Sequence, residues 1–329
     1  MKELEIRPDQ FLKKYLQLIE ADAKRFFSTP IVKTIPCVAC NSVNINHAFY
    51  KLNFTYSVCD DCRTLYLNPR PPLSEFDAFY QDSESSKYWA EIFFPAVAEI
   101  RRQKIIRSRV QELALICEDK KLNIERLIDV GAGFGIFLDE WRMRFPTSEL
   151  LAIEPSCSLS EACRYKGINV VQSIVESVSH NYNGYADLVV CFEVMEHVHS
   201  PLEFLNHLKR LCRPGGYILI STLCIDGFDL QTLWHKSSQI SPPHHINFLS
   251  KVGFFNLFTN AGLKDISVST PGKLDVDIVR NAAFKDSEVL RNQPFIARLI
   301  NDESISVAFQ EFLANNCLSS HAWVMARVP

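Results

Sequence analysis

The sequence predicts an α/β fold in which a mostly parallel sheet carries helices on both faces. Four short apolar runs predict the strands, and they lie within 127–130, 149–155, 186–193 and 211–220. Strands that are buried on both faces read as apolar runs without strict alternation, as these do. A glycine-rich turn and an amphipathic segment, 137–145, follow the first run. This order of strand, turn and helix is typical of a parallel α/β sheet.

The turn after the first run reads Gly131-Ala132-Gly133-Phe134-Gly135. Glycine adopts positive φ at little cost and allows a ligand to approach the backbone. The helix that follows presents free N–H groups to an anionic group. Dinucleotides and S-adenosylmethionine both fit such a turn. The dinucleotide fingerprint requires a glycine three positions after the second one, and this chain has Ile136 there, which argues against NAD and FAD.

The second apolar run ends in an acid, Glu154, about twenty residues after the turn, where a carboxylate can accept both hydroxyls of a ribose. The third run ends in Phe192-Glu193 and continues into Val-Met-Glu-His-Val. An Arg-Pro-Gly-Gly turn leads into the fourth run. The ordered segments DVGAGFG, AIEP, DLVVCFEVMEH and RPGGYILI resemble the class I S-adenosylmethionine-dependent methyltransferases over about residues 121–225.

This resemblance implies a Rossmann-like sheet of seven strands that is mostly parallel, with residues 321–328 as an antiparallel closing strand. It also implies a cofactor site, in which Asp129 and the glycine turn hold the methionine part and Phe192 and Glu193 line the methyl group. Residues 168–178 abut the adenine, although Ile174 replaces the usual acid there. The implied S-adenosylmethionine contacts are Asp129, Gly131, Ala132, Gly133, Phe137, Glu154, Pro155, Ile174, Val175, Glu176, Phe192 and Glu193.

Two Cys-x2-Cys pairs precede this core, with eighteen residues between them. Their members are Cys37, Cys40, Cys59 and Cys62. This spacing predicts a closed four-thiolate zinc site, which leaves no open position for chemistry and is therefore structural. The alternatives are four unrelated buried cysteines or redox pairs, but redox pairs normally open a helix in a βαβ unit. Residues 49–58 have strand composition, so a small ribbon that folds around the metal is expected.

The chain is thus expected to divide into a leader helix (1–35), a zinc ribbon (36–72), a helical connector (73–120) and a methyltransferase domain (121–329). A ribbon, an L-Y-L-N-P-R-P exit and this core in sequence resemble bacterial methyltransferases that act on nucleotide-linked sugars or in polysaccharide and natural-product pathways. Tyr88 and Trp89 of the connector line the pocket in that case, or else belong to the core.

The acceptor of the methyl group must lose a proton, and a histidine or a carboxylate suits that task. Pro242 and Pro243 place His244 and His245 on a constrained loop, which matches the P-x-H-x-x-x-F-S region of the family. The alternative is that one histidine caps the helix that starts near residue 250. The candidate catalytic residues are His244, His245 and Glu193, with Glu196 and His197 as a second pair.

Composition limits the other possibilities. The net charge of −3 gives no basic field for nucleic acid, no apolar run is long enough to cross a membrane, and eleven cysteines without an export signal favour a cytoplasmic protein. A methyltransferase for a small polar acceptor, such as a nucleotide-linked sugar, is the leading hypothesis. The alternatives are a methyltransferase that grips RNA or protein through the ribbon, and a non-catalytic cofactor-binding module.

Overall fold

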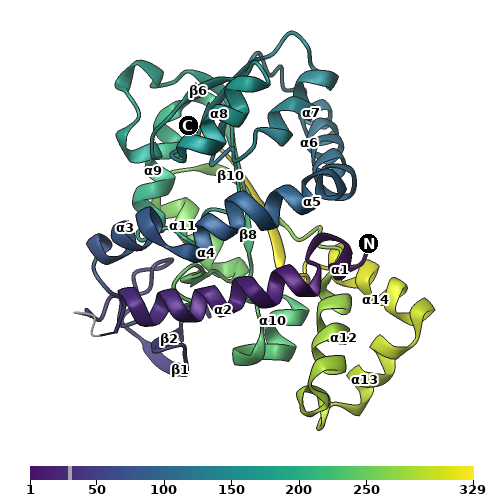
Figure 1. Ribbon diagram of the computed structural model, residues 1–329. Coiled ribbons are helices and arrows are strands. Elements are labelled where there is room, and N and C mark those ends of the chain that lie inside the picture. Colours follow the sequence, from purple (N-terminus) through teal and green to yellow (C-terminus); the bar gives the residue numbers. More distant parts are fainter. Residues whose placement is uncertain (29–31) are drawn as a thin grey trace.

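The computed structural model describes residues 1–28 and 32–329, and its main body is a twisted sheet of seven strands (Figure 1). The strand order is β10-β11-β8-β7-β4-β5-β6. The strands are β4 (Arg126–Val130), β5 (Glu149–Ile153), β6 (Asn169–Val171), β7 (Ala186–Phe192), β8 (Cys212–Leu223), β10 (Lys264–Ser269) and β11 (His321–Arg327).

Strands β4 to β8 pair in parallel, whereas β11 runs antiparallel to both of its neighbours, β8 and β10. The predicted Rossmann-like sheet with an antiparallel closing strand is therefore confirmed. The strand order reverses between β4 and β7, and ligands of open α/β sheets bind at such a switch point, outside the carboxyl ends of the strands.

Helices cover both faces of this sheet, as predicted. The α-helices are α1 (Glu3–Ile6), α2 (Asp9–Phe26), α3 (Leu73–Asp82), α4 (Glu84–Tyr88), α5 (Phe94–Arg101), α6 (Arg107–Asp119), α7 (Ile136–Arg144), α8 (Cys157–Tyr165), α9 (Pro201–Leu211), α10 (Phe228–Leu233), α11 (Lys251–Asn260), α12 (Asp275–Lys285), α13 (Pro294–Asn301) and α14 (Glu303–Asn315). Shorter turns of π- or 3-10 helix are η1 (Trp89–Phe93), η2 (Arg102–Ile106), η3 (Val175–Ser177), η4 (His180–Tyr182), η5 (Trp234–Lys236) and η6 (Ser287–Leu290).

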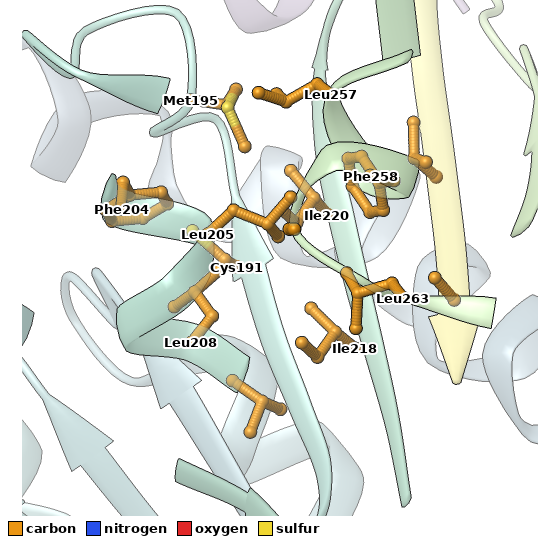
Figure 2. Packing of buried hydrophobic residues seen from close by; sticks show 14 of the residues in the cluster. Cys191, Met195, Phe204, Leu205, Leu208, Ile218, Ile220, Leu257, Phe258 and Leu263 are labelled. Atoms are coloured by element: carbon orange, nitrogen blue, oxygen red, sulfur yellow. The ribbon is translucent and has the colours of Figure 1, made fainter. Parts of the chain in front are cut away.

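Two apolar layers hold the helices on the sheet. Successive residues of a strand point to opposite faces, so Ile128 of β4 joins the layer under α9 and α11, while Leu127 joins the layer under α6 and α7. Figure 2 shows the first layer, where Leu205 and Leu208 of α9 and Phe258 of α11 meet over the strands. These side chains are buried, and each contributes about 1.5–3 kcal/mol by its removal from water.

A second, smaller sheet contains the cysteine pairs and has the order β1-β2-β3-β9. Its strands are β1 (Ile45–Lys51), β2 (Phe54–Cys59), β3 (Leu65–Leu67) and β9 (Asn247–Phe248). Residues 49–58, which have strand composition, belong to two strands, because Leu52 and Asn53 adopt positive φ and turn the chain into a β1–β2 hairpin. The fourth strand, β9, comes from the far end of the chain and pairs with β3 through Phe248 and Leu65.

Helix α2 lies across the front of the molecule in Figure 1, and α4 packs against it. The chain start also contacts the C-terminal helices, because the Glu3 N–H donates to Asp277 of α12 and Lys2 pairs with Glu303 of α14 at 2.7 Å. Helices α12, α13 and α14 form a lobe at the lower right of the view. Among the described residues, no helix has the length and apolar character needed to cross a membrane.

Candidate functional site

The glycine turn after β4 requires glycine at two of its positions. Gly131 has a φ of +75°, and a Cβ there would lie 2.7 Å from Cγ2 of Val194. Gly135 has a φ of +67°, and its Cβ would lie 2.8 Å from Ile168 and 2.9 Å from Cys163. Any other residue would combine an unfavourable backbone conformation with an overlap. The two glycines therefore allow the turn to pack closely against Val194, which follows β7, and against Cys163 of α8.

A cavity of about 1480 Å³ lies beside this turn, at the carboxyl ends of β4, β5 and β7. Helices α2 to α6 contribute its opposite wall. The predicted site residues that line it are Asp129, Gly131, Ala132, Phe137, Glu154, Pro155, Ile174, Val175, Glu176, Phe192, Glu193, His244 and His245. Gly133 lies outside this lining and instead donates its N–H to Glu154 at 2.9 Å. Residues predicted from five separate segments thus meet around one space.

Asp129, at the end of β4, is buried, and its Oδ1 atom has no hydrogen-bond partner in the described part of the chain. Burial raises the pKa of this carboxyl to about 7, and the neighbouring charge of Glu154 adds to the effect while Arg109 opposes it. A buried carboxylate oxygen without a partner is costly. It fits a cationic or hydrogen-donating group of a ligand in the cavity.

Glu154, at the end of β5, is also buried, but both of its oxygens accept backbone N–H groups. Gly133 and Ser156 donate to it, each at 2.9 Å. Burial raises the pKa of this carboxyl, although the two backbone donors work in the opposite direction. Each carboxylate oxygen has a second lone pair, so the carboxylate still has acceptor capacity toward the cavity. The predicted contact with ribose hydroxyls stays a prediction.

The structure adds two arginines that the sequence did not single out. Nη1 of Arg101 is buried without a hydrogen-bond partner among the described residues, and burial, with help from the nearby Arg7, lowers the pKa of Arg101 to about 10. Arg109 donates to Glu193 at 3.3 Å and lies over the Phe192 ring at 4.4 Å. Both line the cavity. In the sequence each resembles an ordinary helix-surface charge, so no local signal marks them.

Glu193 follows β7 with a φ of +57° and takes part in a network of charges. Burial opposes its ionisation, but His321 and Arg109 lower the pKa of Glu193 overall, helped by a hydrogen bond from Ser221. Burial also lowers the pKa of His321, so Arg109 is the partner that carries a charge at neutral pH. A carboxylate held this strongly in the ionised form is a weak proton acceptor.

His244 borders the cavity, but most of its ring is enclosed by neighbouring side chains. It is 4% accessible, its Nε2 lies 2.9 Å from the hydroxyl of Ser85, and its ring lies 4.8 Å from that of Phe79. Burial, with a contribution from His245, lowers the pKa of His244 to about 3. These neighbours come from distant parts of the chain, so the sequence could not show this enclosure.

His245 is less buried than His244 and points in another direction. Its Nδ1 lies 2.6 Å from the carbonyl oxygen of Gln239, and its ring lies 4.7 Å from that of His197. Burial lowers the pKa of His245 to about 4. Neither histidine caps α11, because Ser250 accepts the N–H of Gly253 at 2.8 Å and occupies the cap position. That alternative is therefore wrong.

The four cysteines of the small sheet converge, with all their Sγ atoms within 4.8 Å of one another. The Cys37–Cys62 and Cys40–Cys59 sulfur pairs are each 3.5 Å apart. In the sequence, each Cys-x2-Cys pair is followed directly by a residue with positive φ, Asn41 after Cys40 and Arg63 after Cys62. Sulfur atoms bound to one tetrahedral zinc lie about 3.8 Å apart, so the cluster is consistent with a zinc site.

Of the two connector aromatics, Trp89 lines the cavity and packs against Tyr15 at 5.2 Å and Phe93 at 4.6 Å. Tyr88 is absent from the cavity wall as the described residues define it. Two tyrosines that the sequence did not single out, Tyr15 and Tyr80, do line it. The helical connector and the leader helix therefore both contribute to the wall opposite the sheet.

Comparison with known proteins agrees with this arrangement. The profile of a family described as "Methyltransferase domain" matches residues 98–268, more than half of the chain. A mitochondrial ubiquinone biosynthesis O-methyltransferase of Dictyostelium discoideum is 29% identical over 137 residues, which cover 37% of this chain and 41% of that protein. A tRNA U34 carboxymethyltransferase of Pseudoalteromonas translucida is 26% identical over 178 residues, or 50% of this chain and 52% of that protein.

The chain thus spans about two-fifths to one half of the length of these two relatives. Among solved structures, an S-adenosylmethionine-dependent methyltransferase of Thermotoga maritima, titled a possible histamine N-methyltransferase, is similar with a TM-score of 0.48 and 12% identity, covering 78% of this chain and 96% of that one. The family match covers the glycine turn and strands β4 to β8. The protein belongs to the class I S-adenosylmethionine-dependent methyltransferases.

Proposed function

We propose that this methyltransferase transfers a methyl group from S-adenosylmethionine to a small polar acceptor, such as a nucleotide-linked sugar or a precursor of a polysaccharide or natural product. The observation that supports this is the cavity of about 1480 Å³, which is larger than the about 300–1,000 Å³ of most ligand pockets. It has room for the cofactor and a second molecule. Bound S-adenosylmethionine supplies a sulfonium methyl group that a nucleophile can attack.

The sheet side of the cavity fits the cofactor. Asp129 and Arg101 each present a buried charged atom without a partner among the described residues, and the two charges are opposite in sign. They complement the ammonium and carboxylate groups of an amino acid. The ribose lies at Glu154 in this proposal, and the adenine lies against Ile174, Val175 and Glu176.

The histidine side of the cavity fits the acceptor. Polar groups of Tyr80, Gln239, Ser241 and His245 line this side, and hydroxyl groups of an acceptor can donate to them and accept from them. Of the three candidate catalytic residues, His244 is hydrogen-bonded inside an aromatic cluster and Glu193 is ion-paired. His245 is therefore the residue to which we assign activation of the acceptor, with the cleft orienting the two reactants for in-line transfer.

The four-cysteine site is assigned to structural zinc. Its residues are Cys37, Cys40, Cys59 and Cys62, whose spacing matches a closed tetrahedral site. The small sheet carries the acceptor loop directly, because Tyr56 of β2 donates its hydroxyl to the carbonyl of His245 at 2.6 Å. Zinc in this role shapes the acceptor side of the cavity and takes no part in the chemistry.

A macromolecular acceptor is less well supported, although one relative is named a tRNA methyltransferase. Residues 30–72 contain four cationic side chains, Lys33, Lys51, Arg63 and Arg70, and two of them are engaged within the protein. Arg70 is buried and donates to Asn247 at 2.7 Å, and Lys51 donates to the carbonyl of Ser237 at 2.6 Å. They are therefore not free to contact phosphates.

Two measurements test this proposal. Calorimetry with S-adenosylmethionine, on the wild type and on Arg101→Leu with Arg298→Leu as a control outside the cavity, should show weaker binding only in Arg101→Leu. Radiolabelled methyl transfer should then be screened over nucleotide-linked sugars, small phenols and total RNA. Labelling of a small molecule supports the proposal. Labelling of RNA alone, or binding of S-adenosylmethionine without transfer to any acceptor, would contradict it.

A further inference from the structure

We propose that Glu196, His197 and His245 form a divalent-cation site, separate from the four cysteines, which chelates an acceptor through two neighbouring oxygen atoms. This inference deepens the proposed function and rests on it, since it assigns the acceptor class at the same cavity. One ligand atom from each of the three residues lies within 4.8 Å of the others. All three residues line the cavity.

The distances between the three ligand atoms are close to those found around a bound metal ion. Donor atoms at about 2.1 Å from one ion are at most about 4.2 Å apart, so the three residues need to close by about half an ångström. The rings of His197 and His245 lie 4.7 Å apart at an angle of 75°. Side-chain rotations alone can close such a gap, because both histidines are only partly buried and the cavity borders them.

The hydrogen bonds of His245 and Glu196 each leave one atom free to bind an ion, while Nδ1 of His197 lies 3.4 Å from the Tyr80 hydroxyl. The Gln239 carbonyl can only accept, so Nδ1 of His245, 2.6 Å away, carries the hydrogen and Nε2 keeps its lone pair. A backbone carbonyl that fixes one ring nitrogen in this way is typical of metal-binding histidines. Glu196 accepts the Thr222 hydroxyl at 2.7 Å with one carboxylate oxygen, which leaves the other for an ion.

The backbone also holds the two segments together. The carbonyl oxygen of Glu196 accepts the N–H of Ile246 at 2.8 Å and that of Asn247 at 3.2 Å. The side chain of Asn247 donates to the carbonyl of Val198 at 2.8 Å. The turn after β7 is therefore fixed to the segment that directly follows His245. Such second contacts position ligands before an ion arrives.

Two histidines and one carboxylate form a ligand set that suits Mn²⁺, Fe²⁺ or Zn²⁺ and leaves coordination positions open. A vicinal diol, a catechol or a 2-hydroxy acid could fill two of these positions. The cation would lower the pKa of the bound hydroxyl group, whose proton leaves to water. The oxygen then forms a bond to the methyl carbon while the carbon–sulfur bond breaks, and sulfur keeps the electron pair. His245 activates the acceptor in this account by binding the cation.

Manganese electron paramagnetic resonance on the zinc-loaded full chain tests the site, because Mn²⁺ prefers oxygen and nitrogen ligands to thiolates. We expect about one Mn²⁺ per chain in the wild type, and loss of that binding in His245→Ala and in Glu196→Gln. His235→Ala, which removes an exposed histidine, should bind Mn²⁺ normally. His197→Gln serves as a further variant if either of the others is unfolded by circular dichroism.

Two outcomes would overturn the site. They are absence of Mn²⁺ binding by the wild type at millimolar concentration, and unchanged binding in the folded variants. Calorimetry with S-adenosylmethionine on the same samples separates this failure from failure of the proposed function. Protein that binds S-adenosylmethionine but no Mn²⁺ refutes the cation site alone. The expected acceptor class adds a positive test, since a catechol probe should change the Mn²⁺ spectrum of the wild type and not that of His245→Ala.

Discussion

Replacement of Asp129 by asparagine should stabilise the protein without cofactor while it weakens cofactor binding. Burial raises the pKa of this carboxyl from its ordinary 3.8 to about 7. In the folded state ionisation is therefore unfavourable, and the unfolded state ionises first as pH rises. The difference between the pKa values of the folded and unfolded states corresponds to about 4 kcal/mol of unfolding free energy, at about 1.36 kcal/mol per pH unit. This stability is fully present below pH 3.8 and is lost as pH rises to about 7.

Asparagine has the same shape and no charge, so it removes this pH dependence. Chemical denaturation should show Asp129→Asn to be more stable than the wild type at pH 8, by up to about 4 kcal/mol, with a much smaller difference at pH 5. Calorimetry should show weaker binding of S-adenosylmethionine, because the ammonium group loses its charged partner. Asp139→Asn is a control, since that carboxylate pairs with Arg102 outside the cavity. An equal stability difference at both pH values would refute the buried-charge argument.

Three further predictions follow from the site. Glu154→Ala should bind S-adenosylmethionine at least about ten-fold more weakly, because charge-assisted hydrogen bonds to the ribose are lost. The control Glu161→Ala, which changes an exposed residue, should bind it normally in calorimetry. Equal affinity of Glu154→Ala and the wild type would refute the ribose contact. His245→Ala should lower turnover by about two to four orders of magnitude, while His244→Ala, which empties a packed site, should mainly lower the melting temperature; the reverse pattern in a labelled-methyl assay would exchange their roles. The purified protein should contain about one zinc per chain by elemental analysis, and a strong chelator should lower its melting temperature; a fully folded, metal-free preparation would contradict the site.

The parts of the fold that the sequence predicted are those with a local cause. The apolar runs that became β4, β5 and β7 are buried on both faces, so almost every side chain in them reports the same environment. Gly131 and Gly135 could be identified because only glycine fits their conformation and surroundings. The cysteine pairs were identified from spacing alone, since each pair forms one turn.

What the sequence could not show depends on partners that are distant in the chain. Phe49 to Val58 has strand composition throughout, and only the positive φ values of Leu52 and Asn53 divide it into two strands. Asn53 is a residue that tolerates positive φ and favours turns, but Leu52 is not, so the turn signal in the sequence was weak. Arg101 became a site residue because other elements bury it. His244 is buried because Phe79 and Ser85 pack against it. Composition and periodicity contain no information on such contacts.

The pairing of β9 with β3 has a consequence for engineering this enzyme. Asn247 follows the histidine loop by two residues and belongs to the same sheet as the cysteine pairs, and Ser250 donates its hydroxyl to the carbonyl of Cys62. The small sheet therefore positions the loop that carries His244 and His245. A chimera that exchanges only residues 36–72 with a relative should lose its acceptor selectivity. Both segments should be transplanted as one cassette.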